Sequence, residues 1–169
     1  MLNVLFLCTG NSARSLLAEA YLNACGGDRF RAFSAGSFPT GTPNPYALKT
    51  LRGAGFSVEG LRSKSWDEFA CADAPKMDII ITVCDNAAGE VCPIWPGRPT
   101  SAHWPFPDPA AHKGPEAATL AHFSEVFAHI RARIDALVNL CDAELAGESG
   151  VLAIRAIGDL PLDAPQISQ

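Results

Sequence analysis

Hydrophobic and polar positions divide the chain into two kinds of segment. Continuous apolar runs at residues 2–8 and 77–84 are typical of strands buried on both faces, as in a parallel sheet covered by helices. Apolar stripes at helical spacing are found at residues 12–25, 46–54 and 116–141. Shorter strands are predicted at residues 31–36, 56–58 and 101–104, and a short helix begins at residue 65. This alternation predicts an α/β sandwich with a parallel sheet and right-handed crossovers.

The C-terminal segment after residue 144 has no periodicity that we can interpret. We therefore predict a domain at residues 1–144 and a C-terminal extension of unknown role at residues 145–169. The extension is expected to pack as an extended arm or to be disordered at its end.

Composition narrows the class of protein. The 169 residues are 48% hydrophobic and 18% charged, which is enough for one well-packed domain. A net charge of -5 without a lysine or arginine run argues against nucleic acid as a partner. No apolar run approaches the roughly 18–20 residues that span a bilayer, so we expect no membrane partner and a cytoplasmic protein. In the cytoplasm, its six cysteines are better explained as reduced, catalytic or metal-bound than as a disulfide framework.

The break after the first strand carries the sharpest candidate chemistry, in the run Cys8-Thr9-Gly10-Asn11-Ser12-Ala13-Arg14-Ser15. A strand that turns into a helix N-terminus directs unpaired N–H groups and a helix dipole at an anion. Residues 9–13 are small enough to wrap an oxyanion, and the guanidinium of Arg14 spans two of its oxygens. With a hydrogen bond from Ser15, these donors predict that Cys8 is largely a thiolate nucleophile at neutral pH. The alternative is an inert strand-end cysteine beside an ordinary surface arginine.

Two further features follow the second strong strand. Asp108 lies between two prolines, which aims its carboxylate as a general acid or simply makes a surface turn. Cys84 ends the strand and is predicted to share a sheet rim with Cys8, since ligands bind beyond the carboxyl ends of parallel strands. Cys84 and Cys92 are best explained as exchange-active thiols, although a disulfide between them requires the segment to rearrange. Zinc with His103, or two unrelated buried cysteines, are the alternatives.

The run from Cys8 to Ser15, together with Asp108-Pro109, resembles the low-molecular-weight tyrosine phosphatase superfamily over about residues 2–141. The strand ending Ile-Thr-Val-Cys84, with Cys92 downstream, resembles the arsenate reductases on that fold. Ala110 stands where the phosphatases carry an aromatic residue against the phosphotyrosine ring, which favours a small inorganic oxyanion. The resemblance implies a three-layer sandwich around a four-stranded parallel sheet.

The resemblance also implies a mechanism. Cys8 attacks arsenate held by residues 9–14, Asp108 protonates the leaving oxygen, and Cys84 then attacks Cys8 to release arsenite. In a thioredoxin-coupled branch Cys92 attacks Cys84 next, whereas a glutathione or glutaredoxin branch uses an external thiol instead. No tightly bound cofactor is needed, and we expect a monomer that also accepts phosphate or sulfate.

For metals we expect none, apart from a candidate potassium site that the resemblance places at four positions. These are Asn11, Glu19, Ser34 and Ser63. Two other functions stay open. One is a protein tyrosine or small-substrate phosphatase in which Cys84 guards Cys8 against over-oxidation. The other is a non-catalytic oxyanion-binding redox sensor.

Overall fold

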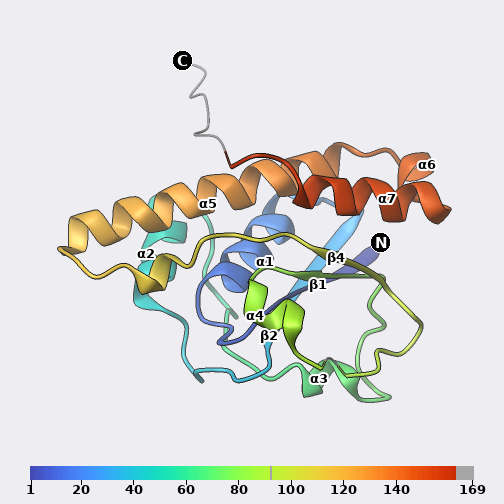
Figure 1. The fold of residues 1–169 in the computed structure, drawn as a ribbon, viewed down its shortest axis with the longest axis horizontal. Coiled ribbons are helices and arrows are strands. Elements are labelled where there is room, and N and C mark those ends of the chain that lie inside the picture. The colour runs from blue at the N-terminus through green and yellow to red at the C-terminus, as the bar shows by residue number, and fades with distance from the viewer. Residues whose placement is uncertain (92, 163–169) are drawn as a thin grey trace.

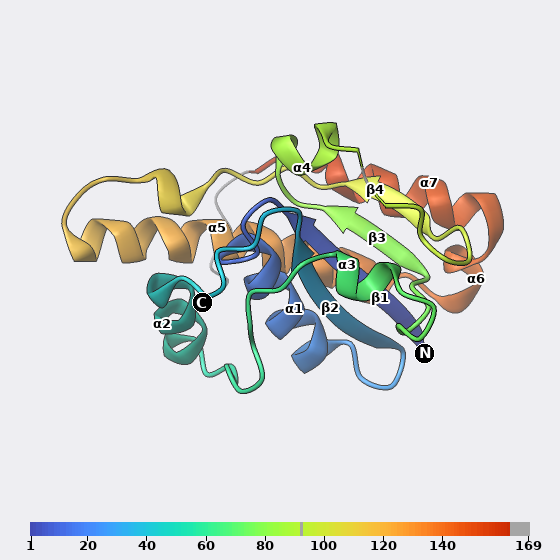
Figure 2. The ribbon, with the colours of Figure 1, turned by 90° about the horizontal axis from the view of Figure 1, so that it is seen from below.

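The computed structural model describes residues 1–91 and 93–162 and centres on one parallel sheet. Its strands lie in the order β2-β1-β3-β4, as Figure 2 shows. Their bounds are β1 Leu2–Cys8, β2 Phe30–Gly36, β3 Ile79–Thr82 and β4 Thr100–His103. In the register of the ladders, Cys8 lies opposite Gly36 and Leu7 opposite Thr82. The carboxyl ends of β1 and β3 therefore meet at one edge.

The helices form a layer on each side of this sheet. They are α1 Arg14–Cys25, α2 Pro45–Gly53, α3 Asp67–Ala70, α4 Asp85–Gly89, α5 Glu116–Asn139, α6 Asp142–Leu145 and α7 Gly147–Gly158, with a 3-10 turn, η1, at Pro109–Ala111. Figure 1 shows α5 and α7 on one side of the sheet and the short α3 on the other. The predicted three-layer α/β sandwich with a four-stranded parallel sheet is confirmed.

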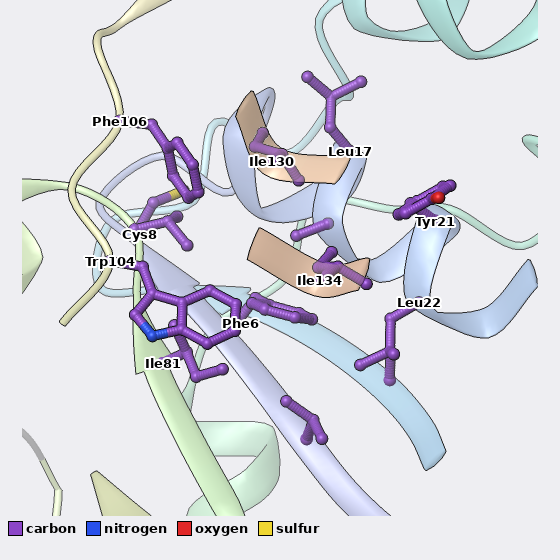
Figure 3. Packing of buried hydrophobic residues seen from close by; sticks show 14 of the residues in the cluster. Phe6, Cys8, Leu17, Tyr21, Leu22, Ile81, Trp104, Phe106, Ile130 and Ile134 are labelled. Carbon is purple, nitrogen blue, oxygen red and sulfur yellow. The ribbon is translucent and has the colours of Figure 1, made fainter. Parts of the chain in front are cut away.

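Side chains of β1 enter two separate cores, which explains why residues 4–8 of this strand are all apolar. Val4 and Phe6 belong to the larger core under α1 and α5, and Leu5 and Leu7 to a smaller one on the α3 side. Trp104 is fully buried in the larger core with its ring centroid 6.4 Å from that of Phe6 (Figure 3). The loop of residues 9–13, called the anion loop below, therefore follows a strand that is packed on both faces.

Two predicted elements are wrong. Residues 56–58 are not a strand; Phe56 instead packs edge-on against the rings of Tyr21 and Phe127, at 5.3 and 5.8 Å. The segment after residue 144 is not an extended arm, because it completes α6 and forms α7; the predicted disorder at its end concerns residues outside the described ranges. Ile154 and Ile157 of α7 are buried in the larger core.

The buried positions of α7 do follow helical spacing, but short and glycine-containing segments gain most of their helical stability from docking. Trp104 donates a hydrogen bond from Nε1 to the Ile154 carbonyl at 2.9 Å, and Arg155 donates to the Ser101 carbonyl at 3.1 Å. These contacts place α7 against β4, at the edge of the sheet (Figure 1). Within the described ranges, no helix is both long enough and apolar enough to cross a membrane.

Candidate active site

The loop after β1 closes around the sulfur of Cys8. Cys8 is 4% exposed, and its Sγ accepts the backbone N–H of Asn11 at 3.1 Å and lies 3.0 Å from the hydroxyl of Ser15. Asn11 has a φ of 43°, which turns the chain through the left-handed region. At the end of β2, Gly36 leaves the room for this turn, because a Cβ there would collide with the carbonyl of Thr9. The α1 helix then begins at Arg14, without a side-chain cap on its first N–H groups.

The prediction that Cys8 is largely thiolate is wrong for this state. Burial raises the pKa of the thiol above its ordinary value of 9.0, and the neighbouring thiol of Cys84 raises it further. Hydrogen bonds from Ser15 and the Asn11 N–H, and the charge of Arg14, lower the pKa but do not outweigh burial. The loop donors are present as expected, but a thiol at 4% exposure has lost the water that would solvate its anion.

The side chain of Asn11 ties the loop to the layer beneath it. It is fully buried and donates from Nδ2 to the hydroxyls of Ser15 and Ser34, each at 2.9 Å. Its Oδ1 accepts the backbone N–H of Lys64 at 2.8 Å. These bonds hold the left-handed turn and orient the hydroxyl that contacts Cys8.

A buried ammonium lies below this network. Lys64 is 6% exposed, and its Nζ is 3.3 Å from Glu19 Oε2, 3.4 Å from Ser34 Oγ and 3.2 Å from the Arg62 carbonyl. Ser34 also donates a hydrogen bond to Glu19. Burial lowers the pKa of Lys64 and raises that of Glu19, and their opposite charges offset both shifts in part. Sequence reasoning overlooked Lys64, although a lysine beside Ser63 is visible in the chain.

The four positions proposed for potassium do not fit the ion. Lys64 Nζ contacts Glu19 and Ser34, so an ammonium takes the place that the resemblance assigned to a cation. The Asn11 oxygen is occupied by a backbone N–H, and Ser63 turns away to donate to the Gly10 carbonyl. Among the described residues, no cluster of three or more histidine, cysteine or acidic side chains forms a metal site.

Arg14 and Asp108 meet across the loop. Arg14 donates from Nη1 to the Phe106 carbonyl at 2.9 Å, and its Nη2 lies 3.6 Å from Asp108 Oδ1. Asp108 caps η1 by accepting the Ala110 N–H at 3.1 Å. The proline-flanked loop therefore presents a half-exposed carboxylate beside the guanidinium.

A second arginine, which sequence reasoning missed, holds that acid loop in place. Arg133 of α5 is 3% exposed and donates to the Pro105 carbonyl at 2.8 Å and to the Leu160 carbonyl at 3.0 Å. Its guanidinium lies over the Phe106 ring, 4.7 Å from the centroid. No local motif marks Arg133, because it occurs within an ordinary helical stripe.

Cys84 lies at the same rim as Cys8. It is the N-cap of α4, where its Sγ accepts the Ala87 N–H at 3.4 Å and lies 3.8 Å from the hydroxyl of Thr9. His103 is bonded to Thr82 and Asp85 through its two ring nitrogens, which leaves neither free for the zinc alternative. Cys92 lies outside the described residues, so its predicted part in a relay remains a prediction.

The remaining candidate positions line the rim between these groups. Thr9, Gly10, Ser12 and Ala13 form the loop between Cys8 and Arg14. The Gly10 and Ser12 carbonyls accept backbone N–H groups from residues 40 and 44. The loop is thus anchored through its carbonyls, which are the groups that an oxyanion cannot use.

Comparison with known proteins agrees with this geometry. A family model described as low molecular weight phosphotyrosine protein phosphatase matches residues 3–149. An arsenate reductase of Bacillus licheniformis is 38% identical over 131 residues, 78% of this chain and 91% of that protein.

Solved structures agree as well. The chain resembles an arsenate reductase in the phosphate binding state, with a TM-score of 0.67, 25% identity and coverage of 82% and 97% of the two chains. It also resembles a Corynebacterium glutamicum thioredoxin-dependent arsenate reductase, with a TM-score of 0.58, 25% identity and coverage of 81% and 60%.

Proposed function

This chain belongs to the low molecular weight phosphotyrosine protein phosphatase family, and on that premise we propose that it is an arsenate reductase that converts arsenate to arsenite. One observation carries the proposal within the family. A second thiol, Cys84, lies at the rim of the anion loop, 3.8 Å from the Thr9 hydroxyl and close enough to raise the pKa of Cys8. A phosphatase needs only one thiol there, whereas a two-electron reduction needs two.

The first step uses the groups around Cys8. Arsenate binds to the N–H groups of residues 9–14 and to the Arg14 guanidinium, and its charge is balanced by that cation and the helix dipole. The Cys8 sulfur attacks arsenic, and Asp108 transfers a proton to the departing oxygen so that water leaves. Because burial raises the pKa of Cys8, the thiol passes its proton to an oxygen of the bound arsenate as the sulfur attacks, and the Ser15 hydroxyl stabilises the negative charge that develops on the sulfur.

The second step is the reduction. The Cys84 sulfur attacks Cys8 Sγ with loss of its proton, the sulfur–arsenic bond breaks, and its electron pair stays on arsenic as arsenite leaves. The product is a Cys8–Cys84 disulfide that an external thiol must reduce. Cys92 is proposed to take the disulfide from Cys84 and present it to thioredoxin, with glutathione or glutaredoxin as the alternative reductant. The thioredoxin-dependent structural relative favours the first of these.

A small-substrate phosphatase is the second candidate, because the family model bears that description. Ala110 argues against phosphotyrosine as the substrate. It follows Pro109 in η1, beside the acid, and contributes only a methyl group. Without an aromatic wall there, the loop recognises the oxyanion and no attached ring.

The deciding experiment compares reductants and cysteine variants. Wild type with arsenate should consume NADPH when coupled to thioredoxin and thioredoxin reductase, and the glutathione and glutaredoxin system serves as the comparison. Cys84→Ser should abolish this turnover but keep hydrolysis of p-nitrophenyl phosphate, because Cys8 and Arg14 are untouched. Cys141→Ser, an exposed cysteine, is the matched control and should turn over normally. Full arsenate turnover by Cys84→Ser would refute the relay.

A further inference from the structure

A carboxylate that the mechanism above does not use turns back onto the anion loop. Glu90 follows α4, and its Oε1 accepts a hydrogen bond from the Thr9 hydroxyl at 3.5 Å. Its other oxygen, Oε2, is buried and has no hydrogen-bond partner in the part of the chain that the structure describes. Burial of a carboxylate oxygen without a hydrogen-bond partner lowers the stability of the fold, so its presence calls for an explanation.

The hydroxyl of Thr9 connects this carboxylate to the second thiol. A carboxylate only accepts hydrogen bonds, so the single proton of the Thr9 hydroxyl points at Glu90. The oxygen lone pairs then face Cys84 Sγ, 3.8 Å away, and the thiol donates to them. The direction of both bonds is thus set, from Cys84 through Thr9 to Glu90.

Among the ionisable groups that the structure describes near Cys84, Glu90 is the one that is available to accept its proton. Arg14 is occupied by the Phe106 carbonyl and faces Asp108. On the far side of α4, Asp85 is paired with His103. Cys8 is committed to the oxyanion in the first step, and among the described residues Glu90 forms no salt bridge.

We propose that Glu90, acting through the Thr9 hydroxyl, takes the thiol proton of Cys84 as that sulfur attacks Cys8. The inference rests on the arsenate reductase function proposed above. The Cys84 S–H bond breaks as its proton passes to Thr9 Oγ1, and the Thr9 proton passes to Glu90 Oε1, which becomes a carboxylic acid. The Cys84 sulfur forms the disulfide with Cys8, and the sulfur–arsenic pair reduces As(V) to As(III). Glu90 contacts the Thr9 hydroxyl and not the reacting sulfur, so it acts on Cys84 only through Thr9.

Electrostatic repulsion and proton transfer predict opposite effects of neutralising Glu90 on the rate at which Cys84 attacks Cys8. The proposal can therefore be tested. Removal of a negative charge near a forming thiolate should speed the attack if only Coulomb repulsion matters. Removal of a proton acceptor should slow it, by about 10²-fold at pH 7 if the acceptor contributes as general bases usually do. The slowing should disappear at high pH, where hydroxide removes the thiol proton without Glu90.

The experiment is a single turnover of the whole protein with arsenate in the absence of reductant, quenched by acid. Mass spectrometry measures the fraction of protein that carries the Cys8–Cys84 disulfide at each time point, in a series of reactions from pH 6 to pH 10. Glu90→Gln should slow disulfide formation at pH 7 and converge with wild type by about pH 10, whereas the exposed Glu59→Gln should match wild type throughout. An equal or faster rate for Glu90→Gln, or the same slowing at every pH, would overturn the proposal.

Two further arms separate the possible failures. If Glu90→Gln does not fold, Thr9→Ser and Thr9→Val carry the same comparison, since only the serine keeps the hydroxyl. If wild type forms no disulfide with arsenate, the proposed function has failed by itself. Hydrogen peroxide then provides the electrophile, by oxidising Cys8 to a sulfenic acid that Cys84 attacks with loss of water. Glu90→Gln must slow that disulfide with the same pH convergence, or the relay is wrong.

Discussion

Removal of the buried ammonium of Lys64 should destabilise the fold far more than removal of a surface lysine. Lys64→Met keeps the length of the side chain and its apolar stem but leaves Glu19 without its cation. The side chains of Lys64 and Glu19 are 6% and 13% exposed. Breaking a buried ion pair on one side costs about 3–5 kcal/mol, because an uncompensated charge stays inside. Removal of both charges, in Glu19→Gln with Lys64→Met, should recover most of that loss.

The loss should depend on pH in a defined direction. Burial raises the pKa of Glu19 above its ordinary value of 4.5, and Lys64 opposes that rise. Without Lys64 the pKa rises further, so the folded variant favours the protonated carboxyl. Stability from a raised pKa is fully present below the unfolded value and is lost as the pH rises through the folded value. The deficit of Lys64→Met should therefore be larger at pH 8 than at pH 5.

Urea unfolding followed by far-UV circular dichroism at pH 5 and pH 8 measures these differences. Lys49→Met is the matched control, because Lys49 pairs with Glu116 on the surface, and its unfolding midpoint should barely move. The wild-type midpoint should be the same in KCl and NaCl, since an ammonium holds the position of the cation. The reasoning is refuted if Lys64→Met loses less than about 1 kcal/mol, or if the double variant is no more stable than Lys64→Met alone.

Three other variants test the core, the C-terminal helix and the thiol. Trp104→Phe removes a fully buried indole N–H, its hydrogen bond to the Ile154 carbonyl and part of the ring volume in the core, which should cost about 1–3 kcal/mol in urea unfolding. Gly158→Ala places a Cβ against a backbone oxygen of β4 and should lower stability by about 1–3 kcal/mol, whereas Gly53→Ala meets open space and should not. Ser15→Ala removes a hydrogen bond that lowers the pKa of Cys8, so iodoacetamide should alkylate that thiol more slowly at pH 7. Unchanged alkylation would mean that Ser15 does not stabilise the thiolate.

The C-terminal helix shows where local pattern was insufficient. Ile154 and Ile157 lie at helical spacing, yet glycines at the start and the end of α7 weaken the pattern. The helix is defined by its neighbours, since Trp104 and the carbonyls of β4 give it partners that are about 50 residues away along the chain. Docking energy, not propensity, decides such a segment.

The ionic state of Cys8 shows the opposite kind of error. Its loop donors were all visible in the sequence, and the Asn11 N–H, Ser15 and Arg14 do act on the sulfur as expected. What the sequence could not show is that core packing leaves the sulfur 4% exposed, and burial then dominates its pKa. Donors can be counted from a motif, but desolvation depends on everything packed around it.

The sequence alone determined the buried parallel strands, the cysteine-to-arginine loop, the proline-flanked acid and the meeting of Cys8 with Cys84. Each follows from neighbours in the chain or from the rule that parallel strands end at one rim. Only the tertiary structure decided that Lys64 takes the place of a cation, that Arg133 holds the acid loop, and that Glu90 reaches Thr9. These contacts join groups from segments 28 to 81 residues apart, and which of many polar groups meet over such distances is settled only by packing.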